Sequence, residues 1–112
     1  METISNEALA AARAKLDATE SRRENILLFY IANGVNIESR TVQIDEGVVI
    51  APGATILAGT ILRGKTVIGA GCVIGPNSLI EDSIVDEGTT VNASQVYGSH
   101  LGPHNNIGPF TH

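Results

Sequence analysis

Three histidines near the end of the chain are the side chains best suited to catalysis: His100, His104 and His112. A neutral imidazole can take the proton from an attacking amine, so His100 or His104 could act as the base in an acyl transfer. Three converging histidines could instead hold zinc, which prefers nitrogen ligands. The alternative is a solvated turn or tail position for each, which is the usual place of a lone histidine. We therefore name His100 and His104 as candidates and expect no metal site.

The remaining charged and glycine-rich segments offer less chemistry. Asp82 and the pair Asp86-Glu87 are interpreted as surface charges. Arg63 and Lys65 flank an expected turn, where they could meet an anion or simply face solvent. The segment Gly69-Ala70-Gly71 is not a phosphate-binding loop, because no helix is expected after it. The sequence therefore predicts no bound cofactor.

The histidines and charged residues named above lie in a part of the chain that has a six-residue repeat, and this repeat indicates the fold that positions them. A branched aliphatic residue stands at every sixth position from 44 to 80, namely Ile44, Ile50, Ile56, Leu62, Ile68, Ile74 and Ile80. This spacing is neither the helical period of 3.6 nor the simple strand period of 2. It is typical of hexapeptide repeats, in which each unit forms one side of a β-solenoid coil. An ordinary β-sandwich is the alternative, and the strict register argues against it.

Two further positions of each unit have a consistent character. A residue that tolerates positive φ follows each aliphatic by three positions, at Gly47, Gly53, Gly59, Gly71 and Asn77, with Lys65 as the exception. Such residues suit the sharp corners between strands. A small or medium side chain follows one position later, at Val48, Ala54, Thr60, Thr66, Cys72 and Ser78. We expect the aliphatics inside the coil and the small residues packed beside them.

After position 80 the repeat shortens in places. The next inward candidates are Val85, Val91, Val96, Leu101 and Ile107, with some steps of five residues. Gly88 keeps the corner position after Val85, and Asn105 matches it only in part near Leu101. Since three sides form one coil, residues 44–112 supply about four coils, within a β-helix domain expected to span residues 35–112. The predicted fold class is all-β, a parallel β-helix of hexapeptide repeats with an N-terminal α-helical segment.

Residues 1–34 form that helical segment, as one helix or two. Ser5 or Asn6 can cap the start, and the stretch 17–20 is either a break or part of a continuous helix. The segment 26–31 is apolar on all sides, and Asn33-Gly34 is a good helix end. We expect this segment to cover one end of the solenoid or to join subunits, because so much apolar surface favours packing against a neighbour.

Composition narrows the partners and the compartment. The formal net charge is −5 and no basic stretch occurs, which argues against nucleic acid or an anionic membrane surface. The apolar run 26–31 is too short to cross a membrane, and no signal peptide is recognised. One cysteine excludes a disulfide framework within the chain. We therefore expect a cytoplasmic protein.

Ordered motifs along the chain resemble a known family. Motifs like those of the family's linker helix occur at Leu9-Ala10, Arg22-Arg23 and Asn33-Gly34-Val35. Motifs like those of the family's coils occur at Val67-Ile68-Gly69, Cys72 to Asn77, Glu81-Asp82-Ser83 and Ile107-Gly108-Pro109-Phe110. The family is that of the bifunctional bacterial UDP-N-acetylglucosamine pyrophosphorylase/glucosamine-1-phosphate acetyltransferases. The resemblance implies a left-handed β-helix and a homotrimer, and it covers about two thirds of the chain.

The family's functional residues lie outside the matching segments. The resemblance places uridylyl transfer in a preceding nucleotide-binding domain and acetyl transfer in coils after Gly-Pro-Phe, so no site residue carries over and we expect a truncated relative. The first hypothesis is a non-catalytic trimeric assembly module, which stacks end to end or recruits a protein partner. The alternative is a minimal acyltransferase or sugar-nucleotide-binding protein with a site between subunits.

Overall fold

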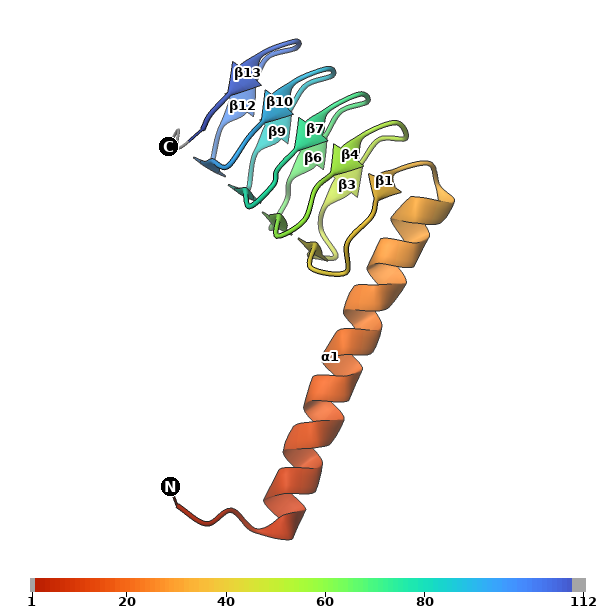
Figure 1. Cartoon of the computed structure of the whole chain (residues 1–112), viewed down its shortest axis with the longest axis vertical. Helices are drawn as coiled ribbons and strands as arrows, with labels where there is room; N and C mark the ends of the chain where they lie inside the picture. The colour runs from red at the N-terminus through yellow and green to blue at the C-terminus, as the bar shows by residue number, and fades with distance from the viewer. Residues whose placement is uncertain (1, 110–112) are drawn as a thin grey trace.

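The computed structural model describes residues 2–109 as one long helix followed by a triangular β-solenoid (Figure 1). The helix α1 spans Asn6–Ala32. The strands are β1 Asn36–Ile37, β2 Gln43–Ile44, β3 Val49–Ile50, β4 Thr55–Ile56, β5 Ile61–Arg63, β6 Val67–Ile68, β7 Val73–Ile74, β8 Leu79–Glu81, β9 Ile84–Val85, β10 Thr90–Val91, β11 Gln95–Tyr97, β12 His100–Leu101 and β13 Asn106–Ile107. This architecture confirms the predicted parallel β-helix of about four coils.

The strands form three parallel sheets, one on each side of the triangular cross-section. Sheet A has the order β1-β4-β7-β10-β13, sheet B has β11-β8-β5-β2, and sheet C has β12-β9-β6-β3. In sheet B, Ile44 lies opposite Leu62, eighteen residues later. In sheet C, Val85 lies opposite Leu101, only sixteen residues later. The coil therefore shortens towards the C-terminus, and the five-residue steps keep aliphatic side chains stacked on aliphatic side chains.

The core is a column of aliphatic side chains inside the coils. All seven aliphatics of the strict repeat are at most 5% exposed, and Val85, Val91 and Val96 continue the column. Leu101 and Ile107 are half-buried and pack against it. The prediction of inward residues is thus confirmed, with weaker burial in the last described coil.

The small positions of the repeat are buried as well. The predicted set from Val48 to Ser78 is at most 2% exposed throughout. The structure adds members that the sequence argument did not name: Val42, Ser83, Thr89 and Ser94. Each lies next to a corner, where a large side chain would collide with the neighbouring coil.

The corners follow the prediction at most positions and differ at three. Gly53 and its equivalents at 59, 71, 77 and 88 have positive φ. Gly47 does not; a Cβ there would stand 2.9 Å from the carbonyl oxygen of Gly64, so close coil packing explains this glycine. At the Lys65 exception, Gly64 takes the positive φ one residue earlier. Near Leu101 the left-handed residue is His104, with φ 56°, rather than Asn105.

The helix runs without a break through residues 17–20. Ser5 is the N-cap, and its Oγ accepts a hydrogen bond of 3.1 Å from the Ala8 N–H. Asn33 is the C-cap, and Gly34 follows with φ 91°. The last turns pack on β1 and β2, where Leu27 enters the core and Tyr30 donates a hydrogen bond to the carbonyl oxygen of Val48. The helix end thus covers the first coil, as predicted.

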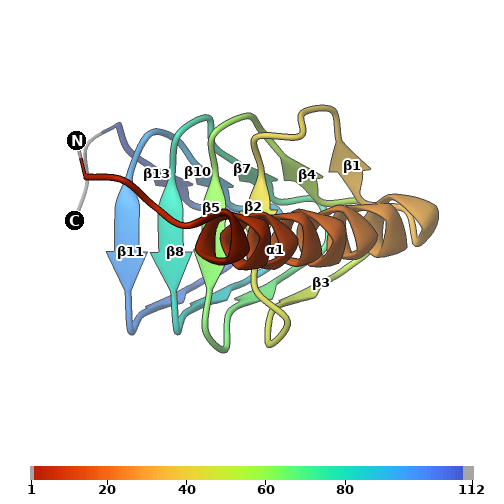
Figure 2. The same cartoon turned by 90° about the horizontal axis from the view of Figure 1, so that it is seen from below.

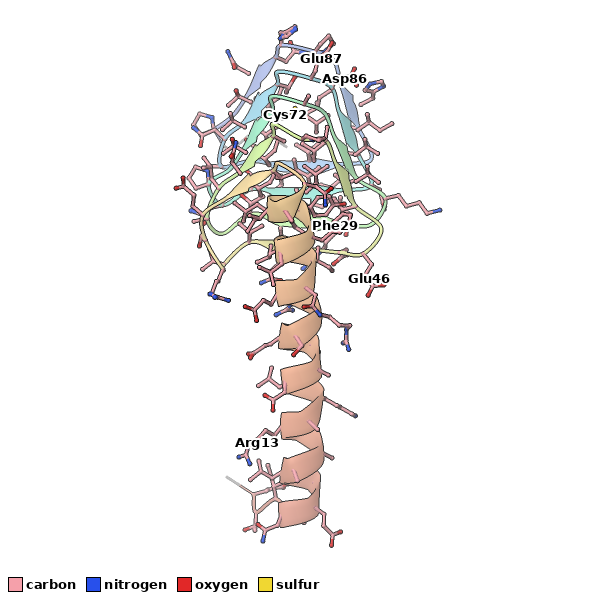
Figure 3. The ribbon with its side chains drawn as sticks, turned by 90° about the vertical axis from the view of Figure 1, so that its right-hand side faces the viewer. Arg13, Phe29, Glu46, Cys72, Asp86 and Glu87 are labelled. Carbon is pink, nitrogen blue, oxygen red and sulfur yellow. The ribbon has the colours of Figure 1, made fainter. Side chains whose placement is uncertain are left out.

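Most of α1 projects away from the solenoid. At about 1.5 Å per residue its 27 residues span about 40 Å. Side chains extend from it on all sides, Arg13 among them (Figure 3). The apolar segment 26–31 is only partly covered within one chain, since Leu28, Phe29 and Ile31 remain 45–60% exposed.

The core column predicts a large difference between neighbouring residues of one strand. We expect Leu62→Ala, which empties a fully buried site, to lower the free energy of unfolding by about 2–5 kcal/mol. Ile61→Ala, on the outward side of the same strand, is the matched control and should cost clearly less. Urea unfolding at one protein concentration measures both. Equal losses would contradict the assignment of Leu62 to the core column.

Candidate functional site

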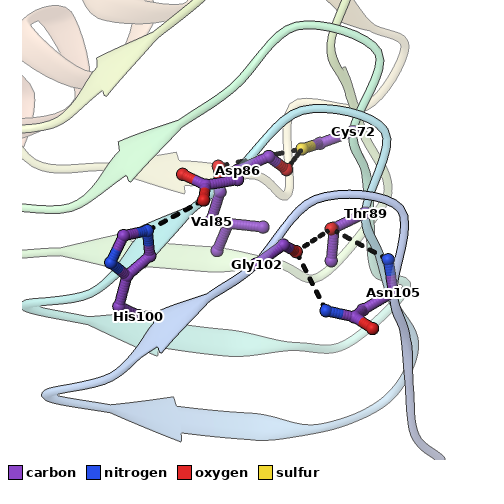
Figure 4. Close-up of polar contacts among 7 residues, drawn as sticks. All are labelled: Cys72, Val85, Asp86, Thr89, His100, Gly102 and Asn105. Atoms are coloured by element: carbon purple, nitrogen blue, oxygen red, sulfur yellow. Dashed lines mark hydrogen bonds and ion pairs between the residues drawn. The ribbon is translucent and has the colours of Figure 1, made fainter.

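The structure brings one candidate histidine together with a carboxylate. His100 lies on β12, directly beside Ile84 of β9, and Asp86 follows β9. His100 Nε2 lies 2.9 Å from Asp86 Oδ2 (Figure 4). A carboxylate in this position orients an imidazole and leaves its other nitrogen free to accept a proton. The pair is open to solvent, with 62% of the His100 side chain exposed.

Sequence reasoning treated Asp86 as a surface charge and missed this contact. The missing information was the length of the coil. Once the coil shortens to sixteen residues, His100 must lie beside Ile84, and Asp86 is two residues further along the same strand direction. The run of five-residue steps was therefore the signal that could have revealed the pair.

The other candidate histidines are not brought into this arrangement. His104 is an exposed corner residue whose backbone N–H donates to the carbonyl oxygen of Glu87. Its left-handed backbone suits a corner. His112 lies outside the described residues, as does Phe110 of the Gly-Pro-Phe motif. Of the two candidate histidines within residues 2–109, only His100 forms a side-chain contact with a second titratable group.

An open groove lies beside the His100–Asp86 pair. Val67, Gly69 and Ile84 line it together with Asp86 and Glu87. No lysine or arginine occurs after Lys65, whereas four acidic residues do: Glu81, Asp82, Asp86 and Glu87. The local charge is therefore unfavourable for phosphate groups, which proteins bind with lysine, arginine or free backbone N–H groups.

Arg63 and Lys65 do not line this groove. Arg63 is exposed at the end of β5 and lies opposite Glu81 of β8. The backbone N–H of Lys65 donates to Asp82 Oδ1 over 2.9 Å. The acidic neighbours fit the interpretation of both residues as part of a solvated surface.

A second groove lies where α1 meets the first coil. Arg40 Nη1 contacts Glu24 Oε1 at 2.7 Å across it, and Leu27, Leu28 and Ile37 form its apolar lining. The hydrogen bond to Glu24 raises the pKa of Arg40, which is charged in any case. The contact joins the helix to the loop after β1, and we assign it a structural role.

The buried polar side chains connect successive coils. Hydroxyl oxygens accept backbone N–H groups of the next coil in four contacts: Ser83 N to Thr66 Oγ1 at 3.4 Å, Ser94 N to Ser78 Oγ at 3.2 Å, Ser99 N to Ser83 Oγ at 3.0 Å and Asn105 N to Thr89 Oγ1 at 3.2 Å. Because each side chain satisfies a backbone group, this ladder of hydroxyls stabilises the stack. These groups are therefore committed to structure.

Cys72 belongs to the same set of small inward positions. Its thiol is fully buried and donates a hydrogen bond of 3.0 Å to the carbonyl oxygen of Asp86 (Figures 3 and 4). Burial raises the pKa of the Cys72 thiol above its ordinary value. A protonated, enclosed thiol is a poor nucleophile. Cys72 is thus a packing residue, as the sequence argument proposed.

Residues 2–109 contain neither a metal-ligand cluster nor a membrane-spanning helix. No group of three or more His, Cys, Asp or Glu side chains in this part of the chain has the arrangement needed to hold a metal ion. No helix within the same residues is long and apolar enough to span a membrane.

Comparison with known proteins supports the class that the fold indicates. Residues 47–82 match the bacterial transferase hexapeptide family (six repeats). The bifunctional protein GlmU of Bifidobacterium longum subsp. infantis is 43% identical over 100 residues, an alignment that covers 88% of this chain. The chain spans only 21% of that relative's length.

The triangular solenoid and the match over residues 47–82 show a hexapeptide-repeat β-helix of the kind found in the bacterial transferase hexapeptide family. Within this class the chain is a homologue of GlmU, and the similarity covers both α1 and the coils. The resemblance to the left-handed β-helix region of that family is thereby confirmed.

The hydroxyl ladder yields a paired prediction. Within residues 2–109, Thr60 Oγ1 is the buried side-chain oxygen without a hydrogen-bond partner, so Thr60→Val should raise the free energy of unfolding by about 1 kcal/mol. Thr66 Oγ1 donates to the Arg63 carbonyl oxygen at 2.7 Å and accepts from Ser83, so Thr66→Val should lower it by about 1–3 kcal/mol. Urea unfolding compares the two. Effects of the same sign would argue against the ladder as a source of stability.

Proposed function

We propose that the chain is a non-catalytic assembly module that associates with itself, as a homotrimer, through its solenoid. The observation that carries this proposal is the exposed aliphatic surface of sheet C, where Val49, Val67 and Ile84 are 57%, 40% and 43% exposed. Parallel sheets are normally covered on both faces. An uncovered aliphatic face on such a sheet favours a partner.

The projecting helix supports the same proposal. On the free half of the helix, Leu9 is 45% exposed and Leu16 is 57% exposed. Near the solenoid, Leu28 is 55% exposed and Phe29 is 60% exposed. Phe29 contacts Tyr30 edge to face, with ring centroids 5.1 Å apart, and still presents most of its ring to solvent. Such a helix can recruit other chains to the assembly. With its single cysteine a buried thiol, the module suits the cytoplasm.

A second candidate function rests on the His100–Asp86 pair. If His100 acts as a general base, the groove beside it would hold an acyl acceptor, and an adjacent copy would complete the site. This is the minimal acyltransferase or sugar-nucleotide-binding alternative. The acidic surroundings of the groove disfavour the phosphate groups of such substrates, and for this reason we rank it second.

Self-association predicts a mass of three chains in solution. We expect sedimentation equilibrium at micromolar concentration to report a trimer, and the same result at low and at high salt. Contacts between uncharged faces respond little to screening, unlike contacts between exposed charges. A monomer at all tested concentrations would exclude the proposal, and dissociation by salt alone would assign the contact to ion pairs instead.

The catalytic alternative is tested by ligand-dependent thermal unfolding. Acetyl-CoA, glucosamine-1-phosphate and UDP-N-acetylglucosamine are added separately at millimolar concentration. We expect no saturable stabilisation, whereas a ligand at 100 times its dissociation constant would add about 2.7 kcal/mol. A saturable shift that is lost in His100→Gln but kept in the control Gln95→Ala, on sheet B, would establish the second candidate in place of the first.

A further inference from the structure

We propose that the projecting part of α1 pairs, in the antiparallel direction, with the same part of α1 in a second copy of the chain. Each helix places the apolar side chains of its free end in a groove at the base of the other helix. This contact is separate from the proposed contact through the solenoid and goes beyond it. The inference follows from the spacing of apolar residues on α1, from that groove and from the charges beside both.

Most of α1 lacks a partner within residues 2–109. Every residue from 6 to 25 except Thr19 is exposed, and no other segment lies alongside this part of the helix in Figure 1. Figure 2 agrees, since α1 stands in front of the coils in the view from below. Most helix stability in proteins comes from packing of one face rather than from intrinsic propensity. A free stretch of this length therefore favours a partner.

Apolar side chains on α1 follow one face from its free end to its base. Leu9 and Leu16 are seven residues apart, Leu27 follows eleven residues later, and Ile31 lies four beyond it. Each of these spacings returns to the same side of an α-helix. Leu27 is buried against the first coil, whereas Leu9, Leu16 and Ile31 are 45%, 57% and 45% exposed. The face that packs on the solenoid thus continues, uncovered, along the free part.

An open apolar groove lies at the base of this face. Leu28 and Ile31 of α1 line the groove together with Ile37 of β1. At the other end of the face, Leu9 is exposed, and Ile4 just before the helix is 60% exposed. A contact about a twofold axis requires a self-complementary surface, in which residue i meets residue j and j meets i. Apolar side chains at one end and an apolar groove at the other meet this requirement.

An antiparallel pair with its twofold axis beside residues 17–18 brings these ends together. At about 1.5 Å per residue, Leu9 then lies level with the partner's Ile26, and Ile4 lies level with the partner's Ile31. The two solenoids lie at opposite ends of the pair, where they do not collide. A parallel pair would bring both solenoids to one end, and each groove would then lie level with the other groove instead of with an apolar side chain.

The charges beside this face match in the same direction. Arg13 follows Leu9 by four residues, and Glu20 and Glu24 continue its side of the helix at spacings of seven and four. In the antiparallel register Arg13 lies between the partner's Glu20 and Glu24, and the twofold axis repeats the contact. A parallel pair would place Arg13 level with the partner's Arg13. Exposed ion pairs contribute little energy, but they select one orientation over another.

The size of the contact predicts a weak association. Helices that overlap from residue 6 to residue 29 share a strip about 36 Å long and about 10 Å wide. The strip covers roughly 360 Å² per copy, less than half of the roughly 800 Å² per partner of a stable interface. We therefore expect the pair to form at protein concentrations on the order of 100 micromolar, above those at which the solenoid contact forms.

Cysteine trapping tests the pair and its direction. Leu16→Cys places a thiol close to the twofold axis, whereas Leu9→Cys places it about 25 Å along the helix from the same residue of the partner. The native Cys72 is buried and does not compete. Under mild oxidation at high protein concentration, we expect Leu16→Cys to form a disulfide-linked dimer on a non-reducing gel and Leu9→Cys to remain unlinked. Equal linking of both variants, or of neither, would overturn the antiparallel pair.

Sedimentation equilibrium separates this contact from the solenoid contact. We expect the wild-type mass to exceed three chains at high concentration, Leu16→Glu to stay at three, and Ala14→Glu, on the other side of the helix, to behave as wild type. Far-UV circular dichroism confirms the helix in each variant, and Leu16→Gln replaces Leu16→Glu should that variant lose helix. A wild-type mass of three chains throughout would overturn the helix pair and leave the trimer intact. A mass that rises only from one chain to two would keep the pair and overturn the trimer.

Discussion

Every feature of this protein depends on the stacking of each coil directly on the one before it. Parallel backbone hydrogen bonds between coils align equivalent positions in columns, so the inward Ile56 lies beside the inward Ile74, and the outward Val73 lies beside the outward Thr90. Within each strand, neighbouring residues face alternately into the coil and out of it. The inner column is therefore uniformly aliphatic, and the small residues at the corners must avoid the backbone of the next coil. The same constraint extends to the outside of the molecule, where it creates continuous faces.

The continuity of those faces links the fold to assembly. A single exposed valine on a protein surface has little consequence, but the stack repeats the exposure at each coil and produces a flat apolar column on sheet C. Charges are collected in the same way on sheet B, beside the projecting helix. Because the hexapeptide repeats, the residue type at one outward position recurs in each coil and determines the character of a whole surface. For this reason we favour association over catalysis as the role of this chain.

Stacking also explains what the potentially reactive groups do. The Thr66 and Ser83 hydroxyls and the Cys72 thiol form hydrogen bonds to backbone groups, most of them in an adjacent coil, because the corners contain backbone atoms that need partners. His100 owes its contact with Asp86 to the shortened coil, which brings β12 beside β9. The irregular steps after Ile80 therefore change which side chains meet, even though the core column continues through them.

By itself the sequence determined the repeat and the inward residues, because both follow from a spacing that recurs every six residues. It also placed the ends of the helical segment, because caps are local signals, but it left open whether the helix breaks at residues 17–20. Ile44 to Ile80 could be assigned to the core from their spacing alone. Only the tertiary structure decided the rest: that Gly47 serves close packing, that His104 adopts the left-handed corner, and that His100 meets Asp86. These outcomes depend on which coil lies above which residue, and that register follows from the accumulated length of all preceding sides rather than from any one hexapeptide.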